Sequence, residues 1–464
     1  MKPTKQDRQH LLLHENNMYK SFVILALPLF GVNLLTSLND LIDTYFVGNM
    51  PNSVAAQSGM SVSWPFMNIL MAFNMGIAVA GVAVISQFLG AGKRKEAQKY
   101  GAMLVTLGIS IGLVINILIY FLAPFVIRWM GAEGGVYDAA LTYVRVRSFE
   151  MIFTFFFAAF QSIRQSRGDT LTPVIYSTIG IFVNIGLNAL FIQVLGWGVF
   201  GAAFATVISQ AIKTPFCFYH LFIEQSDSRL TLTELRPDFT YIKKLVHVAI
   251  PSAASQAFSS LGFLILQVFV LSYGERVSAA FSLGNKLTNL LLMPIMALGS
   301  VLATFAGQNI GKGNPQRALA AYRCCRNLSL TIAIVGGAIL FPFRAEAMAL
   351  LSNDPETVAL GVEYATFVVF AQPLMGFFQS YISLFNGAGK TKFSFYMSTM
   401  RLWGLRLPMI WLFQNFTNLG RFGIWWAVLL SLVLVDLFGA FLFKKVDFTV
   451  SLAHSSQSQT QRVS

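Results

Sequence analysis

The chain has 464 residues, of which 55% are hydrophobic and only 11% are charged. A soluble protein carries about 25% charged residues, so this composition excludes an ordinary soluble domain and indicates a protein embedded in a lipid bilayer. The formal net charge of +13 does not indicate nucleic-acid binding, because the basic residues lie in short clusters between apolar segments.

Apolar stretches long enough to cross a bilayer recur along the whole chain. A spanning helix needs about 20 mostly apolar residues, and twelve stretches meet this requirement. They cover residues 20–47, 56–89, 101–128, 138–164, 171–195, 198–222, 242–273, 277–309, 318–343, 357–386, 393–416 and 421–443. The sequence therefore predicts an all-α polytopic membrane protein with twelve transmembrane helices.

The loops between these stretches differ in their content of Lys and Arg. The amino terminus, the even-numbered loops and the carboxyl terminus hold most of the basic residues, whereas each odd-numbered loop holds at most one. Basic loops stay on the cytoplasmic side of a membrane. We therefore expect a multi-pass protein of the cytoplasmic (inner) membrane with both termini in the cytoplasm.

Short motifs recur at an offset of 221 or 222 residues. QFLGAGKRKEA at 87–97 and QNIGKGNPQRA at 308–318 both fit the pattern Q-x-x-G-x-G-x-x-x-x-A. GVFG at 198–201 is matched by GRFG at 420–423. Repetition at a fixed offset indicates a duplicated structural unit.

The duplication predicts the domain organisation. We expect an amino-terminal six-helix lobe at 20–223, a cytoplasmic linker at 224–241 and a carboxyl-terminal six-helix lobe at 242–445. Cytoplasmic tails are expected at 1–19 and 446–464. Because six spans is an even number, both halves start on the same side, and the repeats are parallel.

Two acids, Asp40 and Asp43, lie three residues apart in the first predicted span. An ionised Asp at the centre of a membrane helix costs about 2.5–3.5 kcal/mol on insertion scales and marks a functional site by default. The second half has Phe263 and Leu266 at the matching positions, so the fold itself does not require the acids. The structural alternatives are hydration of Asp43 near the outer mouth and pairing of Asp40 with a buried Arg.

Other polar residues could complete a site around these acids. Asn184 and Asn188 lie one turn apart in the fifth span, Thr206 lies in the sixth and Gln161 in the fourth. Each has a structural alternative, because polar side chains in membranes also bond neighbouring helices. The charged residues within the later apolar runs should form pairs that the sequence does not assign: Glu150, Arg145, Arg147, Lys286, Arg401 and Arg406.

Six motifs in order resemble the multidrug and toxic compound extrusion (MATE) transporters, over about residues 19–445. They are PLF…LIDTYFVG, QFLGAGKRKEA, RGDTLTP, GVFGAAFATVISQ, QNIGKGNPQRA and FNGAGKTKFS with RLWGLRLP. The resemblance implies two six-helix lobes arranged as a V, and export of organic cations in exchange for protons or sodium. We expect a monomer without a cofactor, whose partners are small organic cations and the lipid bilayer and not nucleic acid.

The family's site residues carry over onto the first half of this chain. Asp43 matches the acid that is expected to bind the coupling ion, either a proton or sodium, and sodium is the one metal expected. Asn184, Asn188 and Thr206 match polar positions near that acid. Many relatives have Asp where this chain has Asn188, which favours the proton over sodium. Relatives that resemble NorM use acids in the second half, one of them near Ser259. The absence of an acid there makes the chain resemble the DinF-like branch.

Two further functions fit part of the pattern. A flippase for a lipid-linked saccharide, from the same superfamily, would be expected to carry a cationic cavity for diphosphate, whereas the acids here face a mixed set of charges. Asn39, Asp40 and Asp43 also match the start of the Asn-Asp-x-x-Asp motif of membrane-embedded prenyltransferases. Val47 stands where that motif needs a third acid. We therefore expect a transporter and not an enzyme.

The orientation can be tested with single cysteines introduced into a cysteine-free variant. We expect residues 90–99 and 311–317 to face the cytoplasm and residues 131–137 to face outside, because of the distribution of basic residues. An impermeant thiol reagent should label a cysteine at Ala132 in intact cells. External labelling of a cysteine at Lys95 would contradict the predicted orientation.

Overall fold

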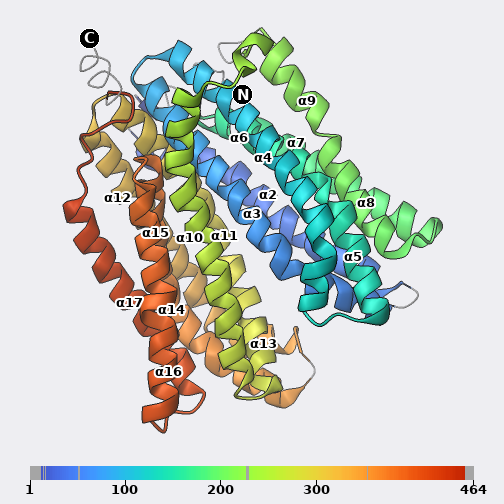
Figure 1. Ribbon diagram of the computed structural model, residues 1–464. Coiled ribbons are helices and arrows are strands. Elements are labelled where there is room, and N and C mark those ends of the chain that lie inside the picture. Colours follow the sequence, from blue (N-terminus) through green and yellow to red (C-terminus); the bar gives the residue numbers. More distant parts are fainter. Residues whose placement is uncertain are drawn as a thin grey trace. The chain divides into compact units, whose positions relative to one another are not determined.

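The computed structural model describes residues 12–454, except residues 14, 16, 51–52, 226–228 and 353, and it does not describe the side chains of residues 53–55, 64–66 and 69. Within this described part the chain forms helices and no strand (Figure 1). The predictions made for residues 1–11 and 455–464 of the two tails lie outside the described residues.

Long helices joined by short turns make up each half of the chain. The first half contains α2 (Met18–Gly48), α3 (Ser53–Gly90), α4 (Arg94–Trp129), α5 (Gly134–Ser148), α6 (Glu150–Gln165), α7 (Leu171–Asn188), η1 (Ala189–Val194), α8 (Gly198–Ala211), α9 (Thr214–Phe218), η2 (Tyr219–Ile223) and η3 (Leu232–Leu235). The second half contains α10 (Phe239–Leu271), α11 (Glu275–Gly311), α12 (Pro315–Leu340), α13 (Arg344–Ala349), α14 (Pro355–Gly387), α15 (Thr391–Thr399), η4 (Met400–Arg406), α16 (Leu407–Phe416) and α17 (Phe422–Lys445).

Each predicted span corresponds to one helix or to a run of helical segments. Among the described residues, nine helices are long and apolar enough to cross a membrane, or ten if the pair α5 and α6, bent by 42°, is one span. The predicted spans 198–222 and 393–416 fall short of that criterion, because α8 ends early and the run from α15 to α16 carries Arg401 and Arg406. The predicted all-α polytopic fold is confirmed.

The repeated glycine motifs form the ends of matching helices in the two halves. Gly92 and Gly313 have φ angles of 73° and 80°, in the left-handed region that glycine enters without steric cost. The amide after each glycine bonds back to the carbonyl five residues earlier, at 3.0 Å and 2.8 Å respectively. This is the usual way for a helix to end on a left-handed glycine. The motif repeats because the same turn is needed twice.

The helices α12 and α14 both begin with a side-chain N-cap. The side chain of Asn314 accepts a hydrogen bond from the amide of Arg317 at 3.1 Å, and Asp354 accepts one from the amide of Thr357 at 3.1 Å. A proline stands in the first turn of both helices, where its missing N–H costs nothing. The hydrogen bond from the Thr357 hydroxyl holds the pKa of Asp354 below its usual value.

The described residues group into two compact units. One comprises residues 31–253, and the other comprises residues 12–30 together with 254–454. In the first unit α4 packs against α6 and α3 packs against α5, while in the second α11 packs against α14 and α12. The candidate site described below lies wholly within the first unit.

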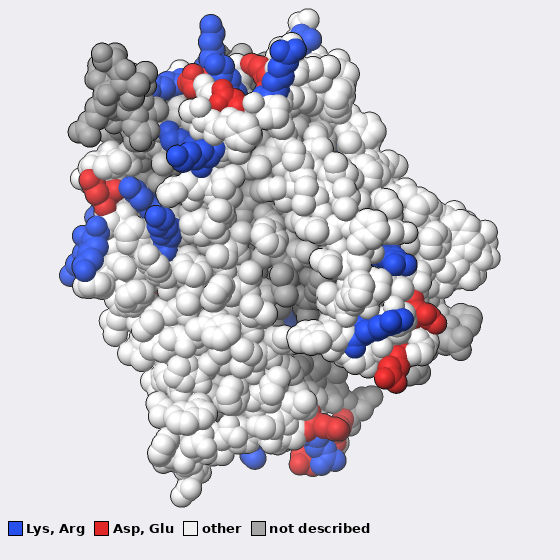
Figure 2. All heavy atoms as spheres, in the orientation of Figure 1, with Lys and Arg blue, Asp and Glu red and all other residues white. Residues whose placement is uncertain are grey.

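Large apolar side chains remain exposed along the helices. Phe125 is 73% exposed, Phe121 is 67% exposed and Leu437 is 64% exposed. Most of the surface visible in Figure 2 belongs to uncharged residues, with Lys, Arg, Asp and Glu in small groups. Such a surface suits contact with lipid tails rather than water.

Close packing of α14 against α11 depends on Gly387. A Cβ built at this position would lie 2.8 Å from the Cα of Ala303 and even nearer to its carbonyl oxygen, so the backbone of α11 would have to move. We expect Gly387→Ala to lower the free energy of unfolding by about 1–3 kcal/mol, measured by thermal unfolding in detergent. Gly186→Ala is the matched control, because nothing lies within 4 Å of its Cβ. Equal melting temperatures for the two variants would contradict this account.

Candidate functional site

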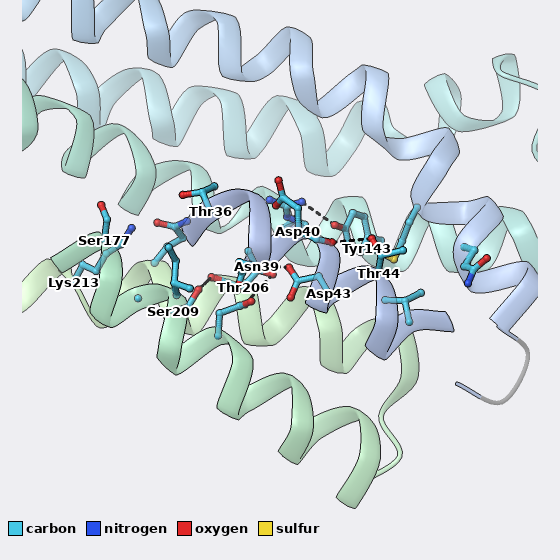
Figure 3. Close-up of a pocket in the computed structure, with 18 of the residues that line it drawn as sticks. Thr36, Asn39, Asp40, Asp43, Thr44, Tyr143, Ser177, Thr206, Ser209 and Lys213 are labelled. Carbon is cyan, nitrogen blue, oxygen red and sulfur yellow. Dashed lines mark hydrogen bonds between the residues drawn. The ribbon is translucent and has the colours of Figure 1, made fainter. Parts of the chain in front are cut away.

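A polar cavity of about 750 Å³ lies within the first unit (Figure 3). It is lined by residues of α2, α3, α5, α7 and α8, and by Lys213 just after α8. This volume lies within the usual range for small-molecule pockets. Polar side chains outnumber apolar ones in the lining, which is unusual among helices whose outer faces meet lipid.

The spacing of the lining residues follows from helix geometry. On α2 the cavity is lined by Thr36, Asn39, Asp40, Asp43 and Thr44. Residues separated by three, four or seven positions share one face of a helix, so one polar stripe of α2 faces the cavity. The stripes of α7 and α8 follow the same rule, at residues 177, 180, 181 and 184 and at residues 206, 209, 210 and 213.

Two amide side chains hold the carboxylate of Asp43. The Nδ2 of Asn188 donates to Oδ1 of Asp43 at 2.6 Å, and the Nδ2 of Asn39 donates to Oδ2 at 3.2 Å. The amide of Asn188 also donates to Asn184 Oδ1 at 3.2 Å, and that of Asn184 lies 3.5 Å from Thr206 Oγ1. Asp43 is thus the end of a hydrogen-bond chain that links α2, α7 and α8.

The two amides that bond to Asp43 also carry oxygen acceptors. The amide oxygens of Asn39 and Asn188 are buried, and within the described part of the chain neither has a hydrogen-bond partner. Together with the carboxylate they form a set of hard oxygen atoms, which suits a proton or a small hard cation. The described residues contain no group of three or more His, Cys, Asp and Glu that could hold a metal ion.

Asp40 lies on the same stripe but is more exposed. Its backbone carbonyl accepts from the Thr44 hydroxyl at 2.8 Å, while none of the ion pairs among the described residues includes its carboxylate. No ion pair within 4 Å joins Asp40 to a buried Arg among the described residues, although Arg147 on the same cavity wall is near enough to attract its carboxylate. The carboxylate remains available to the cavity that it lines.

Arg147 brings a positive charge to the cavity wall at the bend between α5 and α6. Its guanidinium donates to both carboxylate oxygens of Glu150 at 3.0 Å and 2.6 Å, and to the Tyr143 hydroxyl at 2.8 Å. The Glu150 side chain is 1% exposed. The Arg147–Glu150 ion pair therefore spans the break between α5 and α6. The sequence did not predict which charged residues pair, and the structure shows that these two do.

Lys213 is a second cation on the wall, and it has no carboxylate partner among the described residues. It is 7% exposed, and its Nζ lies 4.2 Å from the centre of the Phe157 ring. Its stem passes Gly180, where a Cβ would lie 3.1 Å from the lysine Cδ. The cavity therefore contains a buried ammonium group as well as the two acids of α2.

Most residues predicted for the site lie together. Asp40, Asp43, Asn184 and Thr206 line the cavity, and Asn188 bonds directly to Asp43. Gln161 is different, because it lies on α6 and does not line this cavity.

Several lining residues were not predicted from the sequence, and three of them carry charge or contact Asp43. Asn39 could have been found, since it lies four residues before Asp43 on the same stripe. Lys213 follows the α8 stripe that includes Thr206, so its spacing was also a usable signal. Arg147 was visible as an intramembrane charge, but only the 42° bend shows that it reaches this cavity.

The remaining charged residues of the apolar runs are held in other ways. Arg145 stacks on the Tyr120 ring at 4.9 Å, and Arg406 donates to the Ser431 hydroxyl at 3.0 Å. Arg401 stacks on Phe378 at 4.4 Å. Lys286 is exposed.

The second half also contains an intramembrane acid that the sequence reasoning overlooked. Asp436 lies in α17, and both of its carboxylate oxygens are buried without a hydrogen-bond partner in the described part of the chain. The apolar run LVLVDLFGAF around it carries the signal plainly. The absence of acids noted for the second half therefore holds only at the positions that match Asp40 and Asp43.

A polar cavity among the membrane helices of a polytopic protein is a common feature of membrane transporters. The sequence profile of the MatE family matches residues 28–190 and 251–412, well over half of the chain. The chain belongs to the MatE family. The predicted family and the prediction that the protein is not an enzyme are confirmed, while the DinF-like branch stays a prediction.

Relatives and solved structures agree with this assignment. The chain is 28% identical over 427 residues to a probable multidrug resistance protein NorM of Thermotoga maritima, covering 89% of each chain. It is 26% identical over 412 residues to the probable multidrug resistance protein YpnP of Bacillus subtilis, covering 88% of this chain and 91% of that one. The outward-facing structure of a multidrug resistance MATE family transporter matches with a TM-score of 0.88 at 23% identity, over 96% of this chain and 98% of that chain.

The ion pair behind the cavity wall can be tested by stability measurements. Arg147→Met leaves Glu150 buried without its partner, which should lower the free energy of unfolding by about 3 kcal/mol. The double variant Arg147→Met with Glu150→Gln should recover much of this loss, because no uncompensated charge remains. Thermal unfolding in detergent measures both effects. A double variant as unstable as Arg147→Met alone would show that the pair does not stabilise the bend.

Proposed function

We propose that the chain is a cation-coupled antiporter that exports organic cations and other toxic compounds across the cytoplasmic membrane. Asp43 is the residue on which coupling depends. The observation that carries the proposal is that its carboxylate lines a polar cavity and that, within the described part of the chain, its hydrogen bonds come from two amides. A carboxylate without a fixed positive partner can bind either a proton or the positive group of a substrate. The two therefore compete for one site, and export of one drives uptake of the other.

The amide of Asn188 suits a group that changes its protonation state. An amide carries both donor and acceptor atoms. Its Nδ2 donates to the ionised carboxylate of Asp43 at 2.6 Å, and after rotation its oxygen can accept a hydrogen bond from the neutral acid. An Asp at position 188 would add a second carboxylate to the site, as sodium sites often have, and this chain lacks it. This favours the proton as the coupling ion.

Sodium is the alternative coupling ion. The unpartnered amide oxygens of Asn39 and Asn188 could contribute to a sodium site on Asp43, with a single negative charge. A gradient experiment distinguishes the two ions. Purified protein in liposomes, given a pH gradient or a sodium gradient separately, should export ethidium with the pH gradient alone.

The names of the relatives support drugs as the class of exported compound. Those named above are described as multidrug resistance proteins, and their likeness extends over most of both chains. Because the similarity covers most of both chains, we infer that this chain also exports drugs. The cavity of about 750 Å³ can hold a molecule of drug size. Asp40 offers a second carboxylate for a positively charged substrate.

We further propose that the duplicated halves, 20–223 and 242–445, act as the two lobes of the transporter, joined by the cytoplasmic linker 224–241. The matching glycine turns that end helices in both halves support this division. Both termini lie in the cytoplasm in this proposal. Because the site is formed within one unit of one chain, a monomer is sufficient for transport.

A flippase for a lipid-linked diphosphate is the second candidate. Arg147 and Lys213 line the cavity and favour an acidic group. Glu150 already neutralises Arg147, however, and two acids face the remaining lysine. Transport of a lipid-linked saccharide, without export of any organic cation, would favour this candidate.

The role of Asp43 can be tested by substitution. Asp43→Asn keeps the size and most of the hydrogen bonds of the side chain, but it cannot exchange a proton or attract a cation. We expect this variant to insert and fold normally and to lose active export, measured as drug efflux from energised cells with expression checked. Asp43→Glu should retain partial activity. Asp40→Asn should be milder than Asp43→Asn, because Asp40 is more exposed and has no partner in the hydrogen-bond chain.

Ser259→Ala is the matched control from the second half, and it should leave ion coupling intact. Export by Asp43→Asn at the wild-type rate, with Asp40→Asn inactive, would show that the wrong acid was chosen. Normal export by both variants would contradict the proposal for the whole cavity. A folded Ser259→Ala variant that transports without ion coupling would overturn the assignment to the first half.

A further inference from the structure

Lys213 has a role that export of simple cations does not explain. Burying an ammonium group without a partner costs free energy. Lys213 is only 7% exposed, and it lies on the wall of the cavity for which we propose positively charged substrates. A lysine in this place repels the proposed cargo. Its retention calls for a compensating interaction.

The described residues around Lys213 do not supply a fixed negative partner. The nearby acid Glu150 is engaged by two hydrogen bonds from Arg147. The π face of Phe157, at 4.2 Å from Nζ, offers partial compensation. Gly180 leaves room for the stem of the lysine, so the side chain is accommodated at the wall without a counterion.

The charges of the cavity are separated along its length. Figure 3 shows Lys213 and Ser177 at one end of the labelled side chains and Asp43 and Thr44 toward the other, with Thr206 and Ser209 between them. Among the labelled side chains, the acids therefore lie toward one end and the ammonium group lies at the other. Arg147 also lines the cavity and bonds to Tyr143, but its charge is matched by Glu150.

We propose that Lys213 binds an anionic group of the transported compound, so that the cavity prefers molecules carrying both a positive group and a carboxylate. This inference rests on the proposed function and narrows its substrate class to zwitterions. The positive group of such a molecule lies at the α2 acids and its carboxylate at Nζ of Lys213. A simple cation satisfies the acids but leaves the ammonium group without a partner.

A dye pair that differs only in this charge tests the proposal. A carboxyphenyl rhodamine is a zwitterion, and its methyl ester is a cation of nearly the same shape. Binding of each dye to the purified full-length protein is followed by fluorescence anisotropy. We expect the wild-type protein to bind the free acid more tightly than the ester. In Lys213→Met the ratio of the two affinities should fall at least about tenfold, the loss typical of one hydrogen bond to a charged group.

Two further variants separate charge from structure. Lys213→Arg keeps the positive charge and should retain the preference for the free acid. Lys213→Gln removes the charge with a polar side chain, and it should lose the preference as Lys213→Met does. An unchanged affinity ratio in both neutral variants would overturn the proposal, as would a wild-type protein that binds neither dye or prefers the ester. An equal loss of both dyes in the neutral variants would show a purely structural role.

The proposed function has a separate readout. Ethidium export in liposomes depends on Asp43 and not on recognition of a carboxylate. If ethidium export fails while the affinity ratio depends on Lys213, the export proposal is wrong and the anion site remains. If ethidium is exported while the ratio is insensitive to Lys213, only the further inference is wrong.

Discussion

The cost of placing charge inside a membrane governs how the ionisable residues of this protein are arranged. Isolated charge in lipid costs several kcal/mol, so most buried cations and acids described here have a partner or an aromatic face. Asp436 is the exception. Arg147 and Glu150 satisfy each other across the bend between α5 and α6, and Arg406 bonds to the Ser431 hydroxyl. The carboxylate of Asp43 is held differently, by hydrogen bonds from neutral amides and by no ion pair among the described residues. This difference makes Asp43 the residue at which a mobile cation or proton can bind.

The same constraint explains the composition of the cavity. Asparagine and threonine side chains stabilise a carboxylate without fixing its charge state, because they carry no charge of their own. The chain from Asp43 through Asn188 and Asn184 toward Thr206 joins three helices. A change in the protonation of Asp43 therefore alters hydrogen bonds on α7 and α8 as well as on α2. This gives a physical route from the binding of an ion to a shift of neighbouring helices.

Much of the fold could be predicted from the sequence, because hydrophobic length and glycine turns are local properties. The glycines at 92 and 313 repeat because each must adopt a positive φ. The stripe of α2 could be predicted for the same reason, since helical spacing alone places Asp40 and Asp43 on one face. The contribution of Arg147 could not, because it depends on a 42° bend that no motif marks. Gln161 was predicted to complete the site but does not line this cavity, since the sequence does not show which way α6 turns its polar side chain.

The central claim is that a proton and a substrate cation share the carboxylate of Asp43. Proton release on substrate binding tests it most directly. Purified protein in weakly buffered detergent solution is titrated with ethidium while a pH indicator reports the protons released. Linkage requires that a cation which displaces a proton releases about one proton per molecule bound. We expect this release from the wild-type protein and none from Asp43→Asn. Binding of ethidium without proton release by the wild-type protein, over the pH range in which Asp43 titrates, would contradict the account.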